Sequence, residues 1–296
     1  MMKKIVIAGG TGFIGSYLDM RFRERGYKVV LVSRDKAHVP WELTALTEVL
    51  NKADILINLA GKSLNCRHTP TNKKAILESR IRATELLGEA ILNCTQAPKL
   101  WINASATGVY KPSISHPKSE DETELGNDFL AEVVTSWEKA FFGFELDSTR
   151  QVALRTSVVL GKNGGALGPL LWLTRFGLGG KQASGKQMFS WIHLEDYFRV
   201  VLFLQEQNAL QGVFNCTAPH PISNDVFMHA LRNVLHVPFG IPAPEFVIRM
   251  GAKLIGTEPE LLLNSAYIIP KKLSDAGFKY SFPEINKALH DVLSKR

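Results

Sequence analysis

The stretch Gly9-Gly10-Thr11-Gly12-Phe13-Ile14-Gly15 decides the fold, because glycines recur in it at intervals of three residues directly after an apolar run, Ile5 to Ala8. A run of β-branched and small apolar residues predicts a buried strand, and apolar residues at helical spacing as far as Phe22 predict a helix. A glycine turn between them lets the backbone approach a phosphate, which the helix N-terminus meets with unpaired N–H groups. The stretch therefore predicts a phosphate-binding turn, with a tight turn without ligand as the alternative.

Further apolar runs alternate with helical patterns along the chain. The predicted strands span residues 28–32, 54–60, 99–104, 151–155 and 213–217, and the predicted helices span residues 69–91, 129–142 and 196–204. Strands that are apolar on both faces and alternate with helices are typical of a parallel sheet covered by helices. The sequence thus predicts an α/β fold with a Rossmann-type, doubly wound parallel sheet.

The pattern changes after Leu160, where glycine-rich segments appear and prolines then accumulate from Pro219 to Pro244. We expect residues 1–165 to form the dinucleotide-binding domain, with residues 191–218 returning to it. Residues 166–190 and 219–296 are expected to form a smaller, interwoven C-terminal α/β domain that holds the substrate.

Composition excludes several classes of protein. The chain has 296 residues, 45% of them apolar, and no apolar run of the length that a membrane span needs, so disorder and a membrane protein are not expected. The net charge is +7, but lysines and arginines are scattered rather than gathered on a basic helix with aromatic residues, which argues against nucleic acid as a partner. Cys66, Cys94 and Cys216 form no C-x-x-C motif, and the first apolar run stops after four residues, so export is not expected. We expect a cytoplasmic location.

The end of the second predicted strand indicates which dinucleotide would bind. An NAD site has an acidic residue there, whereas this chain has Ser33 followed by Arg34. A guanidinium can pair with a 2′-phosphate through two parallel hydrogen bonds, so the sequence predicts NADP(H) as the cofactor. Two points stand against this prediction. Asp35 is an acidic residue next to Arg34, and Arg34 as an ordinary solvated loop residue is the alternative.

Several separated motifs together resemble a known family. The chain resembles the extended short-chain dehydrogenase/reductases, and more closely an atypical subgroup of epimerase-like NADP-binding proteins with a C-terminal domain of unknown function. The motifs that carry this resemblance are Gly9-x-x-Gly12-x-x-Gly15, Ser33-Arg34, Asn58-Leu59-Ala60-Gly61, Leu77-Glu78-Ser79-Arg80, Ser105-Ala106-Thr107-Gly108-Val109-Tyr110, Phe129-Leu130-Ala131-Glu132, Arg155-x-x-x-Val159-Leu160-Gly161, Trp191-Ile192-His193-Leu194-Glu195-Asp196 and Ile269-Pro270-Lys271-Lys272-Leu273 with Gly277-Phe278.

The resemblance implies a set of cofactor-binding residues. Leu59 and Ala60 would pass the adenine side, Arg80 would reach the cofactor from the following helix, and the backbone near Val158 would face the nicotinamide. A surface role for Arg80 is the alternative. The predicted cofactor-binding residues are Gly9, Thr11, Gly12, Phe13, Ile14, Gly15, Ser33, Arg34, Leu59, Ala60, Gly61, Arg80 and Val158. Relatives form dimers through helix faces, so a homodimer is left open, although periodicity identifies no such face.

The catalytic pattern of this superfamily is missing. Its tyrosine has a lysine four residues later, which lowers the pKa of the phenol. Only Tyr267 has such a partner here, Lys271, and Pro270 interrupts the turn between them far from the expected helix. Tyr110 and Ser105 are the candidate catalytic substitutes, with structural packing as the alternative for both.

Thr107 at the same strand end is a third candidate. His193 and Asp196 are assigned no proton transfer, because Asp196 is expected to cap backbone N–H groups at a helix start. The acidic stretch 119–124 is expected to form a solvated loop, with a place at the border of the substrate mouth as the alternative. No metal site is predicted, since adjacent carboxylates without histidine fix no coordination geometry.

Two functions follow from these observations. The first is an NADP(H)-dependent oxidoreductase or epimerase-like protein acting on a small carbonyl or sugar-like substrate without the usual Tyr-x-x-x-Lys dyad. The second is a catalytically inactive NADP(H)-binding sensor or regulatory protein. The identity of the small-molecule substrate is not encoded in any motif, because its pocket would come from the least patterned third of the chain.

Overall fold

The computed structural model describes residues 2–162, 164–254 and 256–294. The strands are β1 (Lys4–Ala8), β2 (Lys28–Val32), β3 (Ile55–Asn58), β4 (Leu100–Ala106), β5 (Arg150–Thr156), β6 (Val158–Leu160), β7 (Met188–Phe189), β8 (Trp191–His193), β9 (Gly212–Cys216) and β10 (Ile222–Ser223). The helices are α1 (Phe13–Glu24), α2 (Leu43–Leu50), α3 (Pro70–Leu92), the short turn η1 (Thr107–Val109), α4 (Phe129–Phe142), α5 (Leu167–Arg175), α6 (Leu194–Glu206), α7 (Asn224–Val234), α8 (Glu245–Leu254), α9 (Glu260–Leu263), α10 (Lys271–Asp275) and α11 (Ile285–Ser294).

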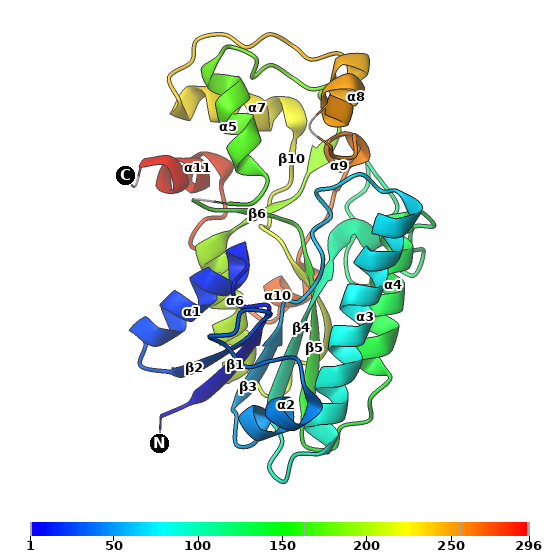
Figure 1. Ribbon diagram of the computed structural model, residues 1–296. Coiled ribbons are helices and arrows are strands. Elements are labelled where there is room, and N and C mark those ends of the chain that lie inside the picture. Colours follow the sequence, from blue (N-terminus) through cyan, green and yellow to red (C-terminus); the bar gives the residue numbers. More distant parts are fainter. Residues whose placement is uncertain (1, 163, 255, 295–296) are drawn as a thin grey trace.

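A parallel sheet forms the centre of the molecule (Figure 1). Within the described residues, six strands follow one another in the order β2-β1-β3-β4-β5-β9, and every neighbouring pair is parallel. This confirms the predicted doubly wound α/β fold. The chain leaves β1 toward one edge of the sheet for β2 and toward the other for β3, and doubly wound sheets bind ligands at the carboxyl ends of the strands at such a reversal.

Alternating side chains of the central strands build two hydrophobic cores, one on each face of the sheet. Ile5 and Ile7 of β1 pack with α1 and α6, whereas Val6 packs with α2, α3 and α4 on the opposite face. All three are fully buried. Consecutive apolar residues such as these are therefore required in the central strands, because helices cover both faces of the sheet.

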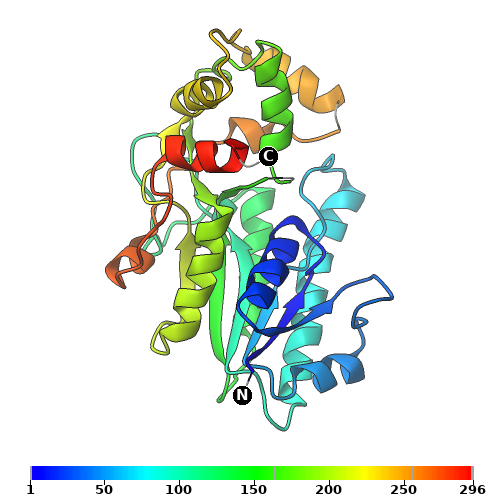
Figure 2. The ribbon, with the colours of Figure 1, turned by 90° about the vertical axis from the view of Figure 1, so that its left-hand side faces the viewer.

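Short elements of the C-terminal half lie over the carboxyl ends of the strands (Figures 1 and 2). Helices α5, α7 and α11 pack around a separate apolar core that includes Trp191, Phe227 and Leu289. Two small strand pairs, β6 with β8 and β7 with β10, join this layer to the rest. Between these segments β9 returns to the main sheet beside β5, so the chain crosses between the two layers more than once.

The helix limits follow from local capping. Helix α4 begins where the carboxylate of Asp128 accepts a hydrogen bond of 2.9 Å from the N–H of Ala131, and α3 begins where Thr69 accepts one from Asn72. Helix α1 ends before Gly26, whose φ of +76° suits glycine. In the described part of the chain, no helix has the length and apolar character that a membrane crossing needs.

Candidate functional site

The glycine turn between β1 and α1 is shaped by close backbone contacts. Gly9 has a φ of +76°, and a Cβ atom there would lie 2.9 Å from the backbone nitrogen of Ala60 after β3. A Cβ at Gly15 would lie 2.6 Å from the Cα of Gly10. Both positions therefore require glycine, since real Cβ atoms do not approach backbone so closely.

The N-terminus of α1 faces open space. Its N-cap is Gly12, which offers no side-chain cap, and the first turn contains no acidic residue. A Cβ at Gly12 would meet only the carbonyl oxygen of Gly9, at 3.5 Å. The first N–H groups of α1 thus lie uncapped at its positive end, which is the arrangement that suits a phosphate.

The end of β2 contains the residues predicted to choose between dinucleotides. Ser33 is buried, and its hydroxyl contacts the Nδ1 atom of His38 at 2.9 Å and accepts the N–H of Asp35. The carboxylate of Asp35 accepts the N–H of Ala37. Arg34 is exposed and has no ion-pair partner among the residues described. The cation next to the glycine turn is therefore available, and the neighbouring carboxylate is engaged with its own backbone.

Arg80 on α3 is a partly buried cation without a carboxylate partner among the described residues. It donates hydrogen bonds of 3.0 and 2.9 Å to the carbonyl oxygens of Lys62 and Ile76, and its guanidinium lies 5.2 Å from the ring centre of Trp137. Burial lowers its pKa to about 10. It still carries a charge at neutral pH and faces the same cavity as the glycine turn.

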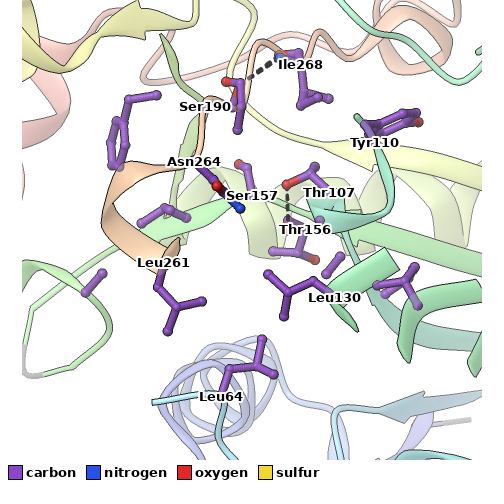
Figure 3. A pocket seen from close by; sticks show the side chains of 18 of the residues that line it. Leu64, Thr107, Tyr110, Leu130, Thr156, Ser157, Ser190, Leu261, Asn264 and Ile268 are labelled. Atoms are coloured by element: carbon purple, nitrogen blue, oxygen red, sulfur yellow. Dashed lines mark hydrogen bonds between the residues drawn. The ribbon is translucent and has the colours of Figure 1, made fainter. Parts of the chain in front are cut away.

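A cavity of about 570 Å³ lies between the carboxyl ends of the strands and the C-terminal layer (Figure 3). The predicted site residues that line it are Gly9, Gly12, Phe13, Ile14, Gly15, Leu59, Arg80, Ser105, Thr107, Tyr110 and Val158. The predicted residues Thr11, Ser33, Arg34, Ala60 and Gly61 lie outside its lining. One cavity therefore brings the glycine turn together with the strand-end hydroxyl groups.

The hydroxyl groups of Ser105 and Tyr110 belong to one buried polar network. Ser105 donates a hydrogen bond of 2.6 Å to Oε1 of Glu138, and Arg155 holds both oxygens of Glu138 at 2.8 and 2.7 Å. Arg155 also donates to the phenolic oxygen of Tyr110 at 2.9 Å, and that phenol donates to Asn215 at 2.9 Å. Both predicted catalytic hydroxyl groups thus have protein partners.

The environment of Tyr110 differs from that of a tyrosine beside a lysine. Burial raises its pKa, and the nearby charge of Arg155 opposes that shift only in part. The phenol is therefore protonated at neutral pH. Helix α4, where the lysine of the usual dyad is expected, contributes apolar residues such as Val133 and Val134 to the cavity.

Glu138 and Arg155 are two polar residues that sequence reasoning did not assign to the site, although Arg155 stands in one of the quoted motifs. A signal was present, because Glu138 lies at helical spacing from Ala131, Val134 and Phe141 on the buried face of α4. Arg155 likewise interrupts an apolar strand. Opposite charges that each lie among apolar residues predict a buried ion pair, and this criterion identifies both.

Two other expectations need correction. Asp196 was expected to cap the start of α6, but the cap is His193, whose Nδ1 atom accepts the N–H of Glu195. Asp196 instead accepts the backbone N–H groups of Ser281 and Phe282 in the distant C-terminal segment. The acidic segment 119–124 is not simply a solvated loop. Glu120 accepts the N–H groups of Asn215 and Lys272 and so ties that segment to β9 and α10.

Two family models match the chain. The NAD dependent epimerase/dehydratase family matches residues 5–131, which contain the glycine turn and Arg80. A domain of unknown function, DUF1731, matches residues 243–292 in the C-terminal layer.

Similar proteins are known over the full length of the chain. A mouse epimerase family protein, SDR39U1, is 38% identical over 98% of this chain and 100% of its own length. The crystal structure of human SDR39U1 (isoform 2) with NADPH superimposes with a TM-score of 0.91, at 35% identity and covering 99% of this chain and 100% of that one. UDP-N-acetylglucosamine 4-epimerase from Bacillus cereus has a TM-score of 0.78 at 17% identity, covering 98% of each chain, which is a likeness of fold.

Proposed function

Because this chain belongs to the epimerase family, we propose that it is an NADP(H)-dependent oxidoreductase or epimerase-like enzyme acting on a small carbonyl or sugar-like substrate. One observation carries the proposal. The uncapped N-terminus of α1, with its required glycines, opens into the same cavity as the hydroxyl groups at the end of β4. A phosphate-binding turn and proton-exchanging groups in one cavity are what nicotinamide chemistry needs.

The residues of the site fit the proposed cofactor. The backbone of Gly9, Gly12 and Gly15 leaves room for a pyrophosphate at the α1 N-terminus, with Thr11, Phe13 and Ile14 in the same turn. Leu59 and Arg80, which line the cavity, would bind the adenine side together with Ala60, and Val158 would lie toward the nicotinamide. When bound, the nicotinamide supplies or accepts a hydride. The NADPH complex of the human relative supports this assignment.

The preference for NADP(H) is assigned to Ser33 and Arg34. The guanidinium of Arg34 has no carboxylate partner among the described residues and would pair with a 2′-phosphate. Asp35 is turned to the N–H of Ala37, so the carboxylate that would repel this phosphate is engaged elsewhere.

Ser105 is the group we assign to proton exchange with the substrate. Its Oγ atom donates to Glu138, which leaves its lone pairs for a substrate hydroxyl. In the oxidising direction the substrate proton would pass to Oγ of Ser105 while the serine proton passes to Oε1 of Glu138; in the reducing direction both moves reverse. Tyr110, protonated and held by Arg155 and Asn215, would orient the network from the other side.

Substitution of Ser105 tests this role. Ser105→Ala should lower the rate of NADPH absorbance change with a panel of aldehydes and ketones by about a hundredfold, the low end for general acid–base catalysis. Tyr110→Phe should have a smaller effect. Ser157→Ala is the matched control, because Ser157 also lines the cavity but donates to the carbonyl oxygen of Cys216 rather than to a carboxylate. Equal rates for Ser105→Ala and Ser157→Ala would contradict the assignment.

An inactive NADP(H)-binding sensor or regulatory protein is the second candidate. It is favoured by the phenol of Tyr110, whose donor and acceptor roles are both taken by protein groups, and by the missing lysine partner. Binding of NADPH without turnover of any carbonyl in the panel would select this candidate over the enzyme.

A further inference from the structure

The charged residues around the cavity are few and already engaged. Among the described lining residues they are Arg80, Asp128 and Glu260. Arg80 lies at the cofactor end, Asp128 caps α4, and Glu260 forms an ion pair of 3.0 Å with Arg249. The part of the cavity built by the C-terminal layer therefore presents no cation from these residues. Proteins bind phosphates with cations and free N–H groups, so this part is poorly suited to a phosphate.

The walls of this part are mainly apolar. Leu261 and Ile268 of the C-terminal layer approach the cavity, and Leu64 and Leu130 approach it from the sheet layer (Figure 3). Phe189 of β7 also lines it. Such walls favour a ligand with an apolar body, because burying its surface removes it from water.

Most polar side chains of this part are satisfied by the protein itself. Ser190 donates to the carbonyl oxygen of Ala266 at 2.6 Å and accepts the N–H of Ile268 at 2.9 Å. The amides of Gln182 and Asn224 pair with each other at 3.0 Å. These groups hold the wall in place and leave little capacity for a highly hydrated ligand.

Asn264 is the exception. It directly follows α9, lines the cavity, and its side chain projects into it (Figure 3). Its backbone N–H donates to the carbonyl oxygen of Glu260, but its side-chain amide makes no hydrogen bond to the residues that the structure describes. The residue is exposed, so the donor and the acceptor of that side chain are both free to meet a ligand that enters the cavity.

We propose that the part of the cavity between β7, α9 and residues 264–268 binds an uncharged, phosphate-free molecule with an apolar body and a single hydroxyl or carbonyl group, which Asn264 holds by a hydrogen bond. This inference rests on the proposed function, whose substrate it narrows. It separates this chain from enzymes that take nucleoside-diphosphate sugars, because among the described lining residues of this part a diphosphate would meet carboxylates and apolar side chains but no cation. Lys73 lines a neighbouring hollow that shares Asp128 and Asn264 with the cavity.

A matched pair of ligands tests the proposal. Geraniol has an apolar body and one hydroxyl group, and geranyl diphosphate replaces that hydroxyl by a diphosphate. Titrated by calorimetry into the NADPH-loaded protein, geraniol should bind at least tenfold more tightly than geranyl diphosphate or UDP-glucose. Equal or tighter binding of either diphosphate overturns the proposal, and so does failure of geraniol to bind.

Variants identify the residues responsible. Asn264→Leu should weaken geraniol binding about fivefold to tenfold, the value of one hydrogen bond, and leave NADPH binding unchanged. Asn233→Leu on the exposed side of α7 is its control. Leu261→Arg should strengthen geranyl diphosphate binding at least tenfold by adding the absent cation, whereas Leu254→Arg, at a position that is 85% exposed and outside the lining, should not. Identical effects of each variant and its control would also overturn the proposal.

The two proposals fail separately. NADPH is titrated first, and its failure to bind would contradict the proposed function. The ligand pair is then titrated into the cofactor-free protein, where the same preference for geraniol would uphold the inference about the cavity.

Discussion

The glycines of the turn after β1 have different roles, although all of them belong to one motif. A Cβ at Gly15 would collide with backbone, whereas a Cβ at Gly12 would project toward the space where a phosphate would lie. Gly15 is therefore required by packing within the protein, and Gly12 is required by the ligand. This distinction can be measured.

We expect Gly15→Ala to lower the free energy of unfolding by about 1–3 kcal/mol, the usual effect of overpacking. Gly12→Ala should change it by less than about 0.5 kcal/mol, because its Cβ has room. It should nevertheless weaken NADPH binding at least tenfold. Urea unfolding and calorimetric titration of both variants measure the two effects. Unchanged NADPH affinity in Gly12→Ala would show that the α1 N-terminus does not receive the phosphate.

Helix α4 and strand β5 are joined at the element scale by the ion pair of Glu138 and Arg155, whose side chains are only 11% and 8% exposed. Burial alone would lower the pKa of Arg155, but hydrogen bonds and charge from Glu138 raise it. Glu138→Gln removes the carboxylate and leaves a buried guanidinium without a counter-charge. Removing one partner of a buried ion pair lowers the free energy of unfolding more than replacing both partners by apolar residues does.

Glu138→Gln should lower the free energy of unfolding by about 3–5 kcal/mol in urea titrations. Glu132→Gln is the control, because Glu132 is exposed on the same helix and should change stability by less than about 0.5 kcal/mol. The double variant Glu138→Met with Arg155→Met should recover most of the loss. A cost for Glu138→Gln no larger than for Glu132→Gln would mean that the pair does not join α4 to β5.

The elements that sequence analysis predicted are those with long apolar patterns. β1, α1, β2 and α4 were all predicted, because each is long enough to show a continuous apolar run or a helical period. β7 and β10, with two residues each, were not, since their pairing depends on segments that meet only in the fold. The site divides in the same way. Local spacing predicts the glycine turn, whereas Asn264 reaches the cavity through the tertiary arrangement of α9.

The whole molecule depends on contacts between the sheet layer and the C-terminal layer. Asp196 on α6 is fully buried and accepts the backbone N–H groups of Ser281 and Phe282, both at 2.8 Å, just before α11. It thereby ties the last part of the chain to the helix that covers the sheet.

Asp196→Ala should lower the free energy of unfolding by roughly 2–5 kcal/mol, because two buried N–H groups lose their acceptor.

Burial raises the pKa of Asp196 above its ordinary value of 3.8, so the folded protein takes up this proton at a higher pH than the unfolded chain. The stability of the wild type relative to Asp196→Asn should therefore increase as the pH falls from 7 toward 4 and then level off. Urea titrations across that range measure it. A difference in stability that decreases toward pH 4 would contradict a raised pKa for the buried carboxyl group of Asp196.

The account as a whole depends on NADP(H) binding at the α1 N-terminus with Arg34 as the group that recognises the 2′-phosphate. Calorimetric titration of the purified protein with NADPH and NADH, repeated with Arg34→Asp and with Lys36→Asp as a control of equal charge change, tests it most directly. We predict that NADPH binds at least tenfold more tightly than NADH to the wild type and to Lys36→Asp, and that Arg34→Asp abolishes this preference. Binding of neither dinucleotide, or a preference that Arg34→Asp leaves unchanged, would contradict the account.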